Sequence, residues 1–253
     1  MDLGLAGKKA LITGSTRGIG RAIANLLADE GVDLAICARN QEEVDTAISE
    51  LSAKGVKVVG SAIDVADKVP YQEWIASAAE QLGGIDIFVP NVSAGGGVMG
   101  EEGWQNNFNI DLLGTTRGIE AAMPFLQQST DAAIVVISST AGVEDFMIPQ
   151  PFNAIKGALI VHASQLSQAL APEGIRVNSV SPGPIFIEGG AWNQIKDAMP
   201  DLYASTLAKI PRGCMGSAEE VANAVAFLAS PAARLITGTN LVADGGFTKR
   251  VQL

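Results

Sequence analysis

The chain has 253 residues, which fits one large domain or two small ones, and 47% of them are hydrophobic, enough for an extended core. Only 17% are charged, which excludes an intrinsically disordered protein. The 27 acidic and 17 basic residues give a net charge of −10, which argues against binding to nucleic acid or to an anionic membrane surface.

No apolar run reaches the length of about 18 residues that a membrane helix needs, and the first residues lack the pattern of a secretion signal. We therefore expect a cytoplasmic protein without a membrane partner. Two cysteines, Cys37 and Cys214, and one histidine, His162, are too few and too scattered for a metal site built from these residues.

Short runs of β-branched residues alternate with longer segments of helical period. This alternation is typical of repeated strand–helix–strand units, in which a parallel sheet lies between two layers of helices. The run 134–137 is continuously apolar, as expected for a central strand that is buried on both faces. Seven strands are predicted, at Ala10–Thr13, Asp33–Cys37, Val56–Ile63, Ile85–Val89, Ala133–Ser138, Arg176–Val180 and Asn240–Ala243.

The intervening segments are predicted to be helical. Ser217 and Glu220 have the spacing of a capping box, which satisfies free N–H groups at a helix start. The segment from Gly183 to about Pro200 has no clear period, and we expect residues 1–253 to form a single domain with a substrate lid at about 183–210. The predicted helices are about Gly18–Glu30, Gln41–Lys54, Pro70–Leu82, Gly103–Gln127, Pro151–Ala171 and Ala218–Leu228.

A glycine-rich turn follows the first predicted strand and leads directly into a helix. Such a turn lets the backbone approach a pyrophosphate, while the helix start offers free N–H donors and a partial positive charge. Its place at the first strand–helix junction predicts dinucleotide binding. The residues are Gly14, Ser15, Thr16, Arg17, Gly18, Ile19 and Gly20, with the spacing Gly-x3-Gly-x-Gly.

The end of the second predicted strand indicates which dinucleotide binds. An NAD site has an acidic residue there for the ribose 2′-OH, whereas this chain has Arg39 and Asn40. Arg39 can pair with the 2′-phosphate of NADP, and Arg17 can approach it from the glycine turn. NADP(H) is therefore the expected cofactor, unless both arginines are merely solvated surface residues.

Further motifs in chain order resemble those of the short-chain dehydrogenase/reductase family, over essentially all 253 residues. They are Asp64–Val65, Ser138–Ser139, Asn178–Gly183 and Ala243–Gly246. The resemblance implies an α/β fold with a doubly wound, seven-stranded parallel sheet and helices on both faces, the Rossmann fold. It also implies cofactor contacts by Asp64, Val65, Asn91, Lys156, Pro182, Gly183, Ile185 and Ile187.

In this family a tyrosine hydroxyl gives a proton to the substrate carbonyl oxygen while the nicotinamide delivers hydride to the carbon. A lysine four residues later lowers the pKa of that phenol and binds the nicotinamide ribose, and a serine thirteen residues before the tyrosine polarises the carbonyl. The resemblance assigns the serine to Ser139 and the lysine to Lys156. The tyrosine position holds Phe152, which has no proton to give.

The missing phenol predicts a protein that binds cofactor but turns over slowly or not at all. Either Phe152 is an introduced or recent change in an otherwise competent reductase, or the chain is a catalytically silent NADP(H)-binding or regulatory protein, or it performs other chemistry with Lys156 or Asp111. Tyr71 and Tyr203 are expected to be structural. Ser139 has no base beside it that would make it a nucleophile.

Three more positions depart from the family pattern. Asp111 stands where an asparagine often passes protons through water to the lysine; it either holds the same water and pairs with Lys156, or is satisfied locally. The dipeptide Val92–Ser93, after Asn91, crowds a place that the family keeps small. Ile187 replaces a threonine that commonly hydrogen-bonds the cofactor.

The substrate is expected between Ser139, the loop Val143–Gln150 and the lid. The apolar candidates there indicate a small to medium, largely apolar ketone or secondary alcohol, unless they only pack the core. They are Val98, Met99, Phe146, Met147, Phe186 and Trp192.

The family resemblance also implies a homotetramer. Apolar residues on more than one face of the two long predicted helices support such an interface, unless they pack only on their own sheet. These residues are Met123, Phe125, Ile155, Leu159, Leu166 and Leu170.

Overall fold

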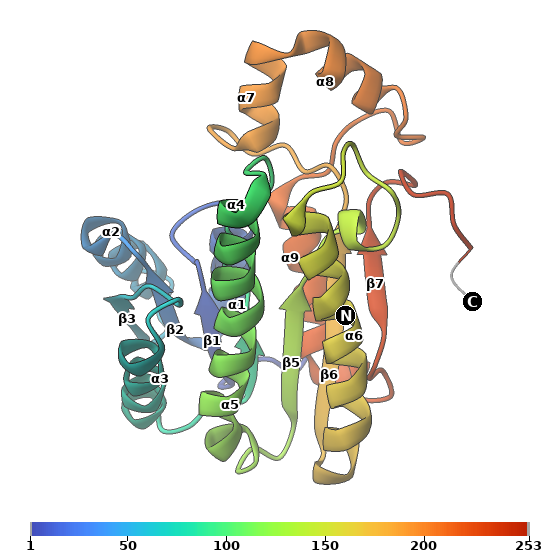
Figure 1. Cartoon of the computed structure of the whole chain (residues 1–253). Coiled ribbons are helices and arrows are strands. Elements are labelled where there is room, and N and C mark those ends of the chain that lie inside the picture. Colours follow the sequence, from blue (N-terminus) through green and yellow to red (C-terminus); the bar gives the residue numbers. More distant parts are fainter. Residues whose placement is uncertain (1, 252–253) are drawn as a thin grey trace.

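One seven-stranded, fully parallel sheet runs through the computed structural model, which describes residues 2–251 (Figure 1). The strand order is β3-β2-β1-β4-β5-β6-β7, so the chain winds outward from β1 in one direction and then returns to continue in the other. The predicted doubly wound α/β fold is confirmed. The strands are β1 (Lys9–Thr13), β2 (Asp33–Ala38), β3 (Val58–Ala62), β4 (Ile87–Val89), β5 (Ala132–Ile137), β6 (Ile175–Pro182) and β7 (Asn240–Ala243).

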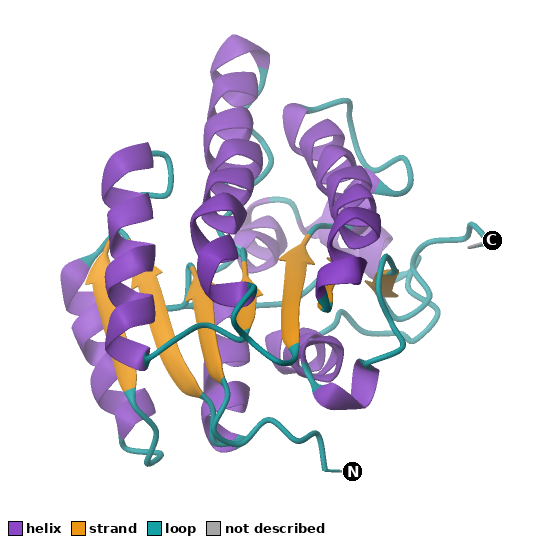
Figure 2. Ribbon diagram, turned by 90° about the horizontal axis from the view of Figure 1, so that it is seen from below, coloured by secondary structure: helices purple, strands orange, loops and turns teal. Residues whose placement is uncertain are grey.

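Helices cover both faces of this sheet (Figure 2). One layer contains α1 (Gly18–Asp29), α2 (Gln41–Ser52) and α9 (Ala218–Ala229), and the other contains α3 (Lys68–Leu82), α5 (Gly114–Leu126) and α6 (Pro151–Leu170). Short 3-10 turns lie at Thr140–Gly142, Ala171–Glu173 and Pro231–Ala233.

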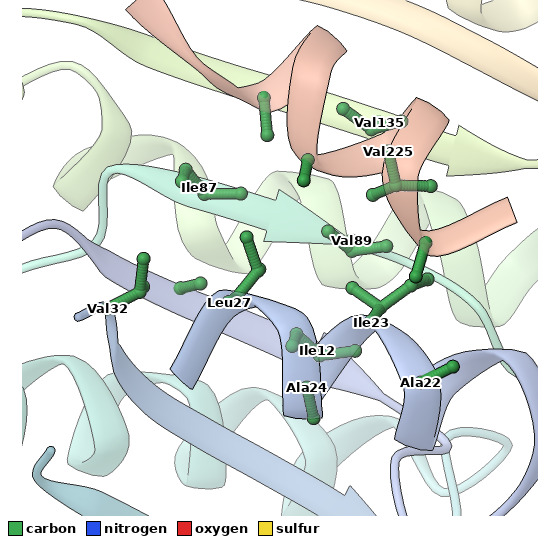
Figure 3. Close-up of a cluster of buried hydrophobic side chains, with 14 of the residues drawn as sticks. Ile12, Ala22, Ile23, Ala24, Leu27, Val32, Ile87, Val89, Val135 and Val225 are labelled. Atoms are coloured by element: carbon green, nitrogen blue, oxygen red, sulfur yellow. The ribbon is translucent and has the colours of Figure 1, made fainter. Parts of the chain in front are cut away.

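Each strand contributes to two separate cores, because successive side chains point to opposite faces of a sheet. On β5, Val135 and Ile137 pack under α1 and α9, while Ile134 and Val136 pack under α3, α5 and α6. Figure 3 shows part of the first core, where Ile23 of α1 and Val225 of α9 lie over the sheet. The continuous apolar run in the sequence therefore reflects burial on both sides.

Most predicted boundaries are correct to within two residues. The capping box at the start of α9 is confirmed: the Glu220 N–H donates to Ser217 Oγ (3.3 Å), and the Ser217 N–H donates to Glu220 Oε2 (3.0 Å).

The helix predicted over Gly103–Gln127 is present as an unbroken helical stretch from Gly100 to Leu126, but its middle part is not α-helical. The structure has α4 (Gly100–Asn106), then a π-helical segment (Asn107–Leu113), then α5. The wider turn of a π-helix is a local change that a helical hydrophobic period does not reveal, and such segments are frequent at functional sites. Asp111 lies within this segment.

The expected lid region, whose first part from Gly183 to about Pro200 has no clear period in the sequence, contains helices. Two short helices, α7 (Ala191–Ala198) and α8 (Pro200–Leu207), stand above the carboxyl ends of the strands (Figure 1). None of the residues of α7 is buried, and Thr206 is the only buried residue of α8. Helices of eight residues are too short for a helical period to be recognised in the sequence.

The apolar residues expected at a subunit interface mostly face the protein's own core. Ile155, Leu159 and Leu170 are buried, and Met123, Phe125 and Leu166 pack against the same core, so the apolar excess of these helices is not evidence for an interface. Other side chains are exposed instead, namely Trp104, Phe108 and Val161. Within residues 2–251, no helix has both the length and the hydropathy needed to cross a bilayer.

Gly118 marks the tightest contact between α5 and its neighbours. A Cβ added there would lie 2.2 Å from Tyr71 Oη and 2.8 Å from Phe88 Cζ. We expect Gly118→Ala to lower the free energy of unfolding by about 1–3 kcal/mol, because overpacking forces the buried neighbours to move. Urea denaturation measures this loss.

The double variant Gly118→Ala/Tyr71→Phe should recover part of the loss, since it removes the nearer clashing atom, with Tyr71→Phe alone as the control. A Gly118→Ala protein within about 0.5 kcal/mol of the parent would contradict this account of the contact.

Candidate active site

The glycine turn has the backbone geometry of an anion site. Gly14 and Gly18 have φ values of 68° and 59°, which favour glycine, and Ser15 Oγ donates to the Ile12 carbonyl oxygen (2.7 Å) from inside the turn. Helix α1 begins at Gly18 with no side chain capping it and no acidic residue in its first turn. Its free N–H groups and positive dipole end therefore fit a phosphate group.

Asn91 fixes this turn from the neighbouring strand end. Its backbone N–H donates to Thr13 Oγ1 (3.0 Å), and its Nδ2 donates to the carbonyl oxygens of Thr13 (3.0 Å) and Gly14 (3.1 Å). A Cβ at Gly20 would lie 2.1 Å from the Gly14 carbonyl oxygen. The site is thus built where the winding direction of the sheet changes, between β1 and β4, the usual place for a dinucleotide.

The two arginines expected to bind a 2′-phosphate are both exposed, and neither forms an ion pair with another described residue. Their polar neighbours are engaged within the fold. Asn40 caps α2 by accepting from the Glu43 N–H (3.1 Å), and Thr16 Oγ1 donates to Glu43 Oε2 (2.8 Å). Arg17 and Arg39 therefore remain available to an anion.

The other expected cofactor contacts lie at the same edge of the sheet. Asp64 Oδ1 accepts from the Ala66 N–H (3.0 Å), and the buried Val65 packs beside Gly114. Gly183, after Pro182 at the end of β6, donates to the Ala243 carbonyl oxygen (3.0 Å). Their contacts with cofactor stay predictions.

Two isoleucines begin the segment that leads to the lid. Ile185 is buried and bridges to Gly216, whereas Ile187 lies beside the glycine turn, with its Cδ1 3.4 Å from the Cβ position of Gly18. An apolar side chain therefore sits next to the site of the expected phosphates, and the contact of either isoleucine with cofactor stays a prediction.

Lys156 and Asp111 form an ion pair in the interior. Lys156 Nζ lies 3.0 Å from Asp111 Oδ1, and the two side chains are 3% and 0% exposed. The ammonium also donates to the Ile137 carbonyl oxygen (3.1 Å), and Asp111 Oδ2 accepts from the Ala94 N–H (2.8 Å). Of the two alternatives for Asp111, the structure shows pairing with Lys156.

Phe152 lies beside this ion pair, and Ser139 follows two residues after Ile137, whose carbonyl oxygen Lys156 binds. Lys156 Nζ lies 5.6 Å from the centroid of the Phe152 ring, so the aromatic position is beside the ammonium as the spacing on one helix face requires. Ser139 Oγ caps the 3-10 turn by accepting from the Ala141 N–H (3.2 Å), which leaves its own proton free to be donated. Ser138 Oγ donates to the Lys156 carbonyl oxygen (2.8 Å) and ties α6 to the end of β5.

Comparisons with known proteins agree with this arrangement. The family described as enoyl-(acyl carrier protein) reductase matches residues 14–248. Isoepoxydon dehydrogenase patN of Penicillium expansum is 39% identical over 250 residues, which cover 97% of this chain and 96% of that protein. The chain belongs to the short-chain dehydrogenase/reductase family.

Solved structures of this family have the same fold. L-Sorbose reductase from Gluconobacter frateurii, in complex with NADPH and L-sorbose, has a TM-score of 0.90 and 29% identity, with 99% of this chain and 100% of that chain covered. NAD⁺-bound xylitol dehydrogenase has a TM-score of 0.88 and 26% identity, with 96% and 99% covered. A nicotinamide cofactor is thus supported for this oxidoreductase family member, and the glycine turn fits it.

Neither of the two tyrosines contacts Ser139 or Lys156, so neither replaces the family's proton donor in this structure. Tyr71 is fully buried on α3, and burial raises its pKa well above the usual range. Tyr203, on α8, packs edge-on against Phe186 with 6.5 Å between ring centroids, under Lys196.

Burial also raises the pKa of Cys37 to about 12, so this thiol stays protonated at neutral pH.

A cavity of about 310 Å³ lies between the loop after β5, α8 and the C-terminal segment; Thr140 lines it, whereas Ser139, Phe152 and Lys156 do not. Of the predicted lining residues, Phe146 and Met147 line it, whereas Val98, Met99, Phe186 and Trp192 do not. The remaining walls include residues that sequence analysis missed. The full lining is Thr140, Glu144, Asp145, Phe146, Met147, Leu202, Thr206, Lys209, Phe247, Thr248 and Lys249.

The Phe146 ring contacts both the lid and the C-terminal segment. Its ring meets that of Trp192 in the lid at 6.4 Å and that of Phe247 near the C-terminus at 5.9 Å, both edge-on. The Lys249 N–H donates to Glu144 Oε2 (2.9 Å) and attaches the C-terminal segment to the same loop. No local pattern signals a contact between positions about 100 residues apart, so the sequence did not predict this wall.

The close packing around Gly20 gives a test of the cofactor turn. We expect Gly20→Ala to weaken NADPH binding by about tenfold or more, because the added Cβ displaces the Gly14 backbone and the Asn91 amide. Quenching of protein fluorescence on titration with NADPH measures the dissociation constant.

Ala24→Gly, one turn further along α1, is the control: it weakens the helix by about 1 kcal/mol but does not touch the turn. Equal affinities for the parent and Gly20→Ala would show that the cofactor does not lie on this turn.

Proposed function

We propose that the protein is an NADP(H)-dependent oxidoreductase that interconverts a small to medium, largely apolar ketone and a secondary alcohol, and that Phe152 slows this form of it. The observation that carries the proposal is that the family's serine and lysine are present as Ser139 and Lys156, with the Phe152 ring beside the ammonium in place of the tyrosine. The cavity of about 310 Å³, which Thr140 lines one residue after Ser139, supports a substrate of modest size.

The protein's own groups have distinct parts in this reaction. The Ser139 hydroxyl donates a hydrogen bond to the substrate carbonyl and stabilises the oxygen as negative charge develops there. The Lys156 ammonium lies beside position 152 and is paired with Asp111. When bound, the cofactor supplies the two electrons for reduction. The proton has no donor at Phe152, and loss of such a general acid costs about 10² to 10⁴ in rate.

The preference for NADP(H) rests on Arg17 and Arg39. Both are exposed and free of ion pairs among the described residues, and the second strand ends without the acidic residue that binds a ribose 2′-OH. The NADPH complex of the sorbose reductase supports this choice, whereas the xylitol dehydrogenase binds NAD⁺ on the same fold.

A catalytically silent NADP(H)-binding or regulatory protein is the second candidate. The Lys156–Asp111 pair favours it, because the pair satisfies the buried ammonium without any tyrosine.

A homotetramer is proposed for either function, with the exposed Trp104, Phe108 and Val161 as candidates for its contacts. A cytoplasmic location and the lack of a nucleic-acid partner stay predictions from the sequence.

Removal of the two arginines tests the cofactor preference. We expect Arg17→Ala and Arg39→Ala each to weaken NADPH binding by about tenfold to a hundredfold, since each loses a charge-assisted hydrogen bond, and to change NADH binding little. Arg21→Ala is the matched control, because Arg21 lies on α1 and pairs with Glu50. Tighter binding of NADH than of NADPH by the parent protein would contradict the proposal.

Restoration of one hydroxyl tests the reaction. We expect Phe152→Tyr to raise the rate of NADPH consumption by about 10²-fold or more on the best ketone of a panel, because it returns the general acid. The panel should include apolar ketones and also hydroxylated ketones and ketoses, given the names of the relatives.

Phe152→Leu, which removes the ring without adding a donor, is the control and should stay inactive. If Phe152→Tyr also stays inactive on the whole panel while NADPH still binds, the silent binder is the better description.

A further inference from the structure

We propose that Asp111 is a positioning residue that holds and neutralises Lys156, so that a phenol restored at position 152 would lack most of the positive charge that activates it. The inference rests on the proposed function and adds a second difference from an active reductase to the first. Phe152 lacks the proton-donating hydroxyl, and Asp111 cancels the positive charge of Lys156 that would lower the pKa of a phenol at that position.

The contacts of the ammonium account for this role. Lys156 Nζ forms an ion pair with Asp111 Oδ1 at 3.0 Å and donates a hydrogen bond to the Ile137 carbonyl oxygen at 3.1 Å. The Phe152 ring lies 5.6 Å away. The second oxygen of Asp111 accepts from the Ala94 N–H, which holds the carboxylate beside Lys156.

The electrostatic consequence follows from the spacing of the charges. An unpaired ammonium within about 4–6 Å lowers the pKa of a neighbouring acid by about 1–3 units. A full negative charge at 3.0 Å from that ammonium turns the pair into a dipole, whose field at position 152 is much weaker than that of the lysine alone. An asparagine at position 111 would keep the shape and leave the lysine charge uncancelled.

Among the described residues, the other charged groups near α6 are exposed or have other partners, and none of them pairs with Lys156. On α4, Glu101 and Glu102 are exposed, and on β6 the Arg176 guanidinium donates to the Leu228 and Ser230 carbonyl oxygens at the far end of the strand. His162, further along α6, faces Glu120 of α5. The 3-10 turn after α6 has Glu173, which accepts from Gln127. Among residues 2–251, Asp111 is the one acid that pairs with Lys156.

The chain is suited to a direct measurement, because it has only two tyrosines. Burial raises the pKa of Tyr71 well above the usual range, so a phenol introduced by Phe152→Tyr is observed against a small background. We would follow tyrosinate absorbance during alkaline titration of Phe152→Tyr and of Phe152→Tyr/Asp111→Asn, without substrate. We expect the introduced phenol to ionise about one pH unit lower, or more, in the double variant.

Phe152→Tyr/Asp131→Asn is the matched control. Asp131 is also buried and lies 3.7 Å from Lys8 Nζ and 3.6 Å from Arg234 Nη2, just before β5 and thus at the opposite end of that strand from Ser139. Its loss should leave the titration of the introduced phenol unchanged. Near-ultraviolet circular dichroism verifies that each variant is folded.

A second variant covers the case in which Asp111→Asn prevents folding. Phe152→Tyr/Asp111→Leu/Lys156→Met replaces the whole pair by apolar side chains of similar volume, a change that buried pairs often tolerate. If the pair is neutral as a unit, the introduced phenol should titrate within about half a pH unit of its value in Phe152→Tyr.

The outcomes separate this inference from the proposed function. An unchanged titration in Phe152→Tyr/Asp111→Asn, or a rise of about one unit or more when the whole pair is removed, would overturn the role of Asp111. The expected shift without turnover of any ketone would support Asp111 and count against the reductase. Turnover by both variants, with the alkaline limb of the pH–rate profile moved in parallel with the phenol, would support both.

Discussion

The buried contact between Lys156 and Asp111 is the interaction on which the arrangement of the site depends. It joins α6 to the π-helical segment, and the same two side chains also bind the carbonyl oxygen of Ile137 at the end of β5 and the N–H of Ala94 after β4. A buried charge without a partner costs several kcal/mol, so these four segments have to meet for the chain to fold stably. The side chains of Lys156 and Asp111 therefore belong to the candidate site and also stabilise the fold.

Sequence patterns were sufficient for the sheet and for the glycine turn that leads into α1, because both are local signals. Binding of the cofactor at this turn stays a prediction. The apolar run of β5 is long enough to identify a strand buried on both faces, and the glycines of the turn follow β1 directly. Pairing of Asp111 with Lys156 was one of two readings open to the sequence. The π-helical segment, the two lid helices and the wall formed by Phe247 were not predictable, because they depend on small departures from helical period or on contacts between distant positions.

The apolar helices show a different limit of sequence patterns. Hydrophobic periodicity identifies a stripe, but a broadly apolar helix such as α6 leaves open which residues face the sheet and which face outward. Leu159 is buried in the core, whereas Val161, two residues later on the same helix, is exposed. Side chains that pack a protein's own core and side chains that attract another subunit have the same composition, and only the fold distinguishes them.

The backbones of Gly142 and Gly157 touch, with so little room that a Cβ on Gly142 would lie 2.4 Å from the nitrogen of Gly157. This contact lies at the base of the loop 143–150. The segment that carries Ser139 and the helix that carries Lys156 therefore pack directly on each other, without the loop between them. Insertions, deletions or a complete exchange of the loop can then reshape the wall around Phe146 without displacing either group. The two parts of the candidate site are thus independent in this respect: glycine backbones fix the positions of Ser139 and Lys156, whereas the side chains of the loop are free to vary.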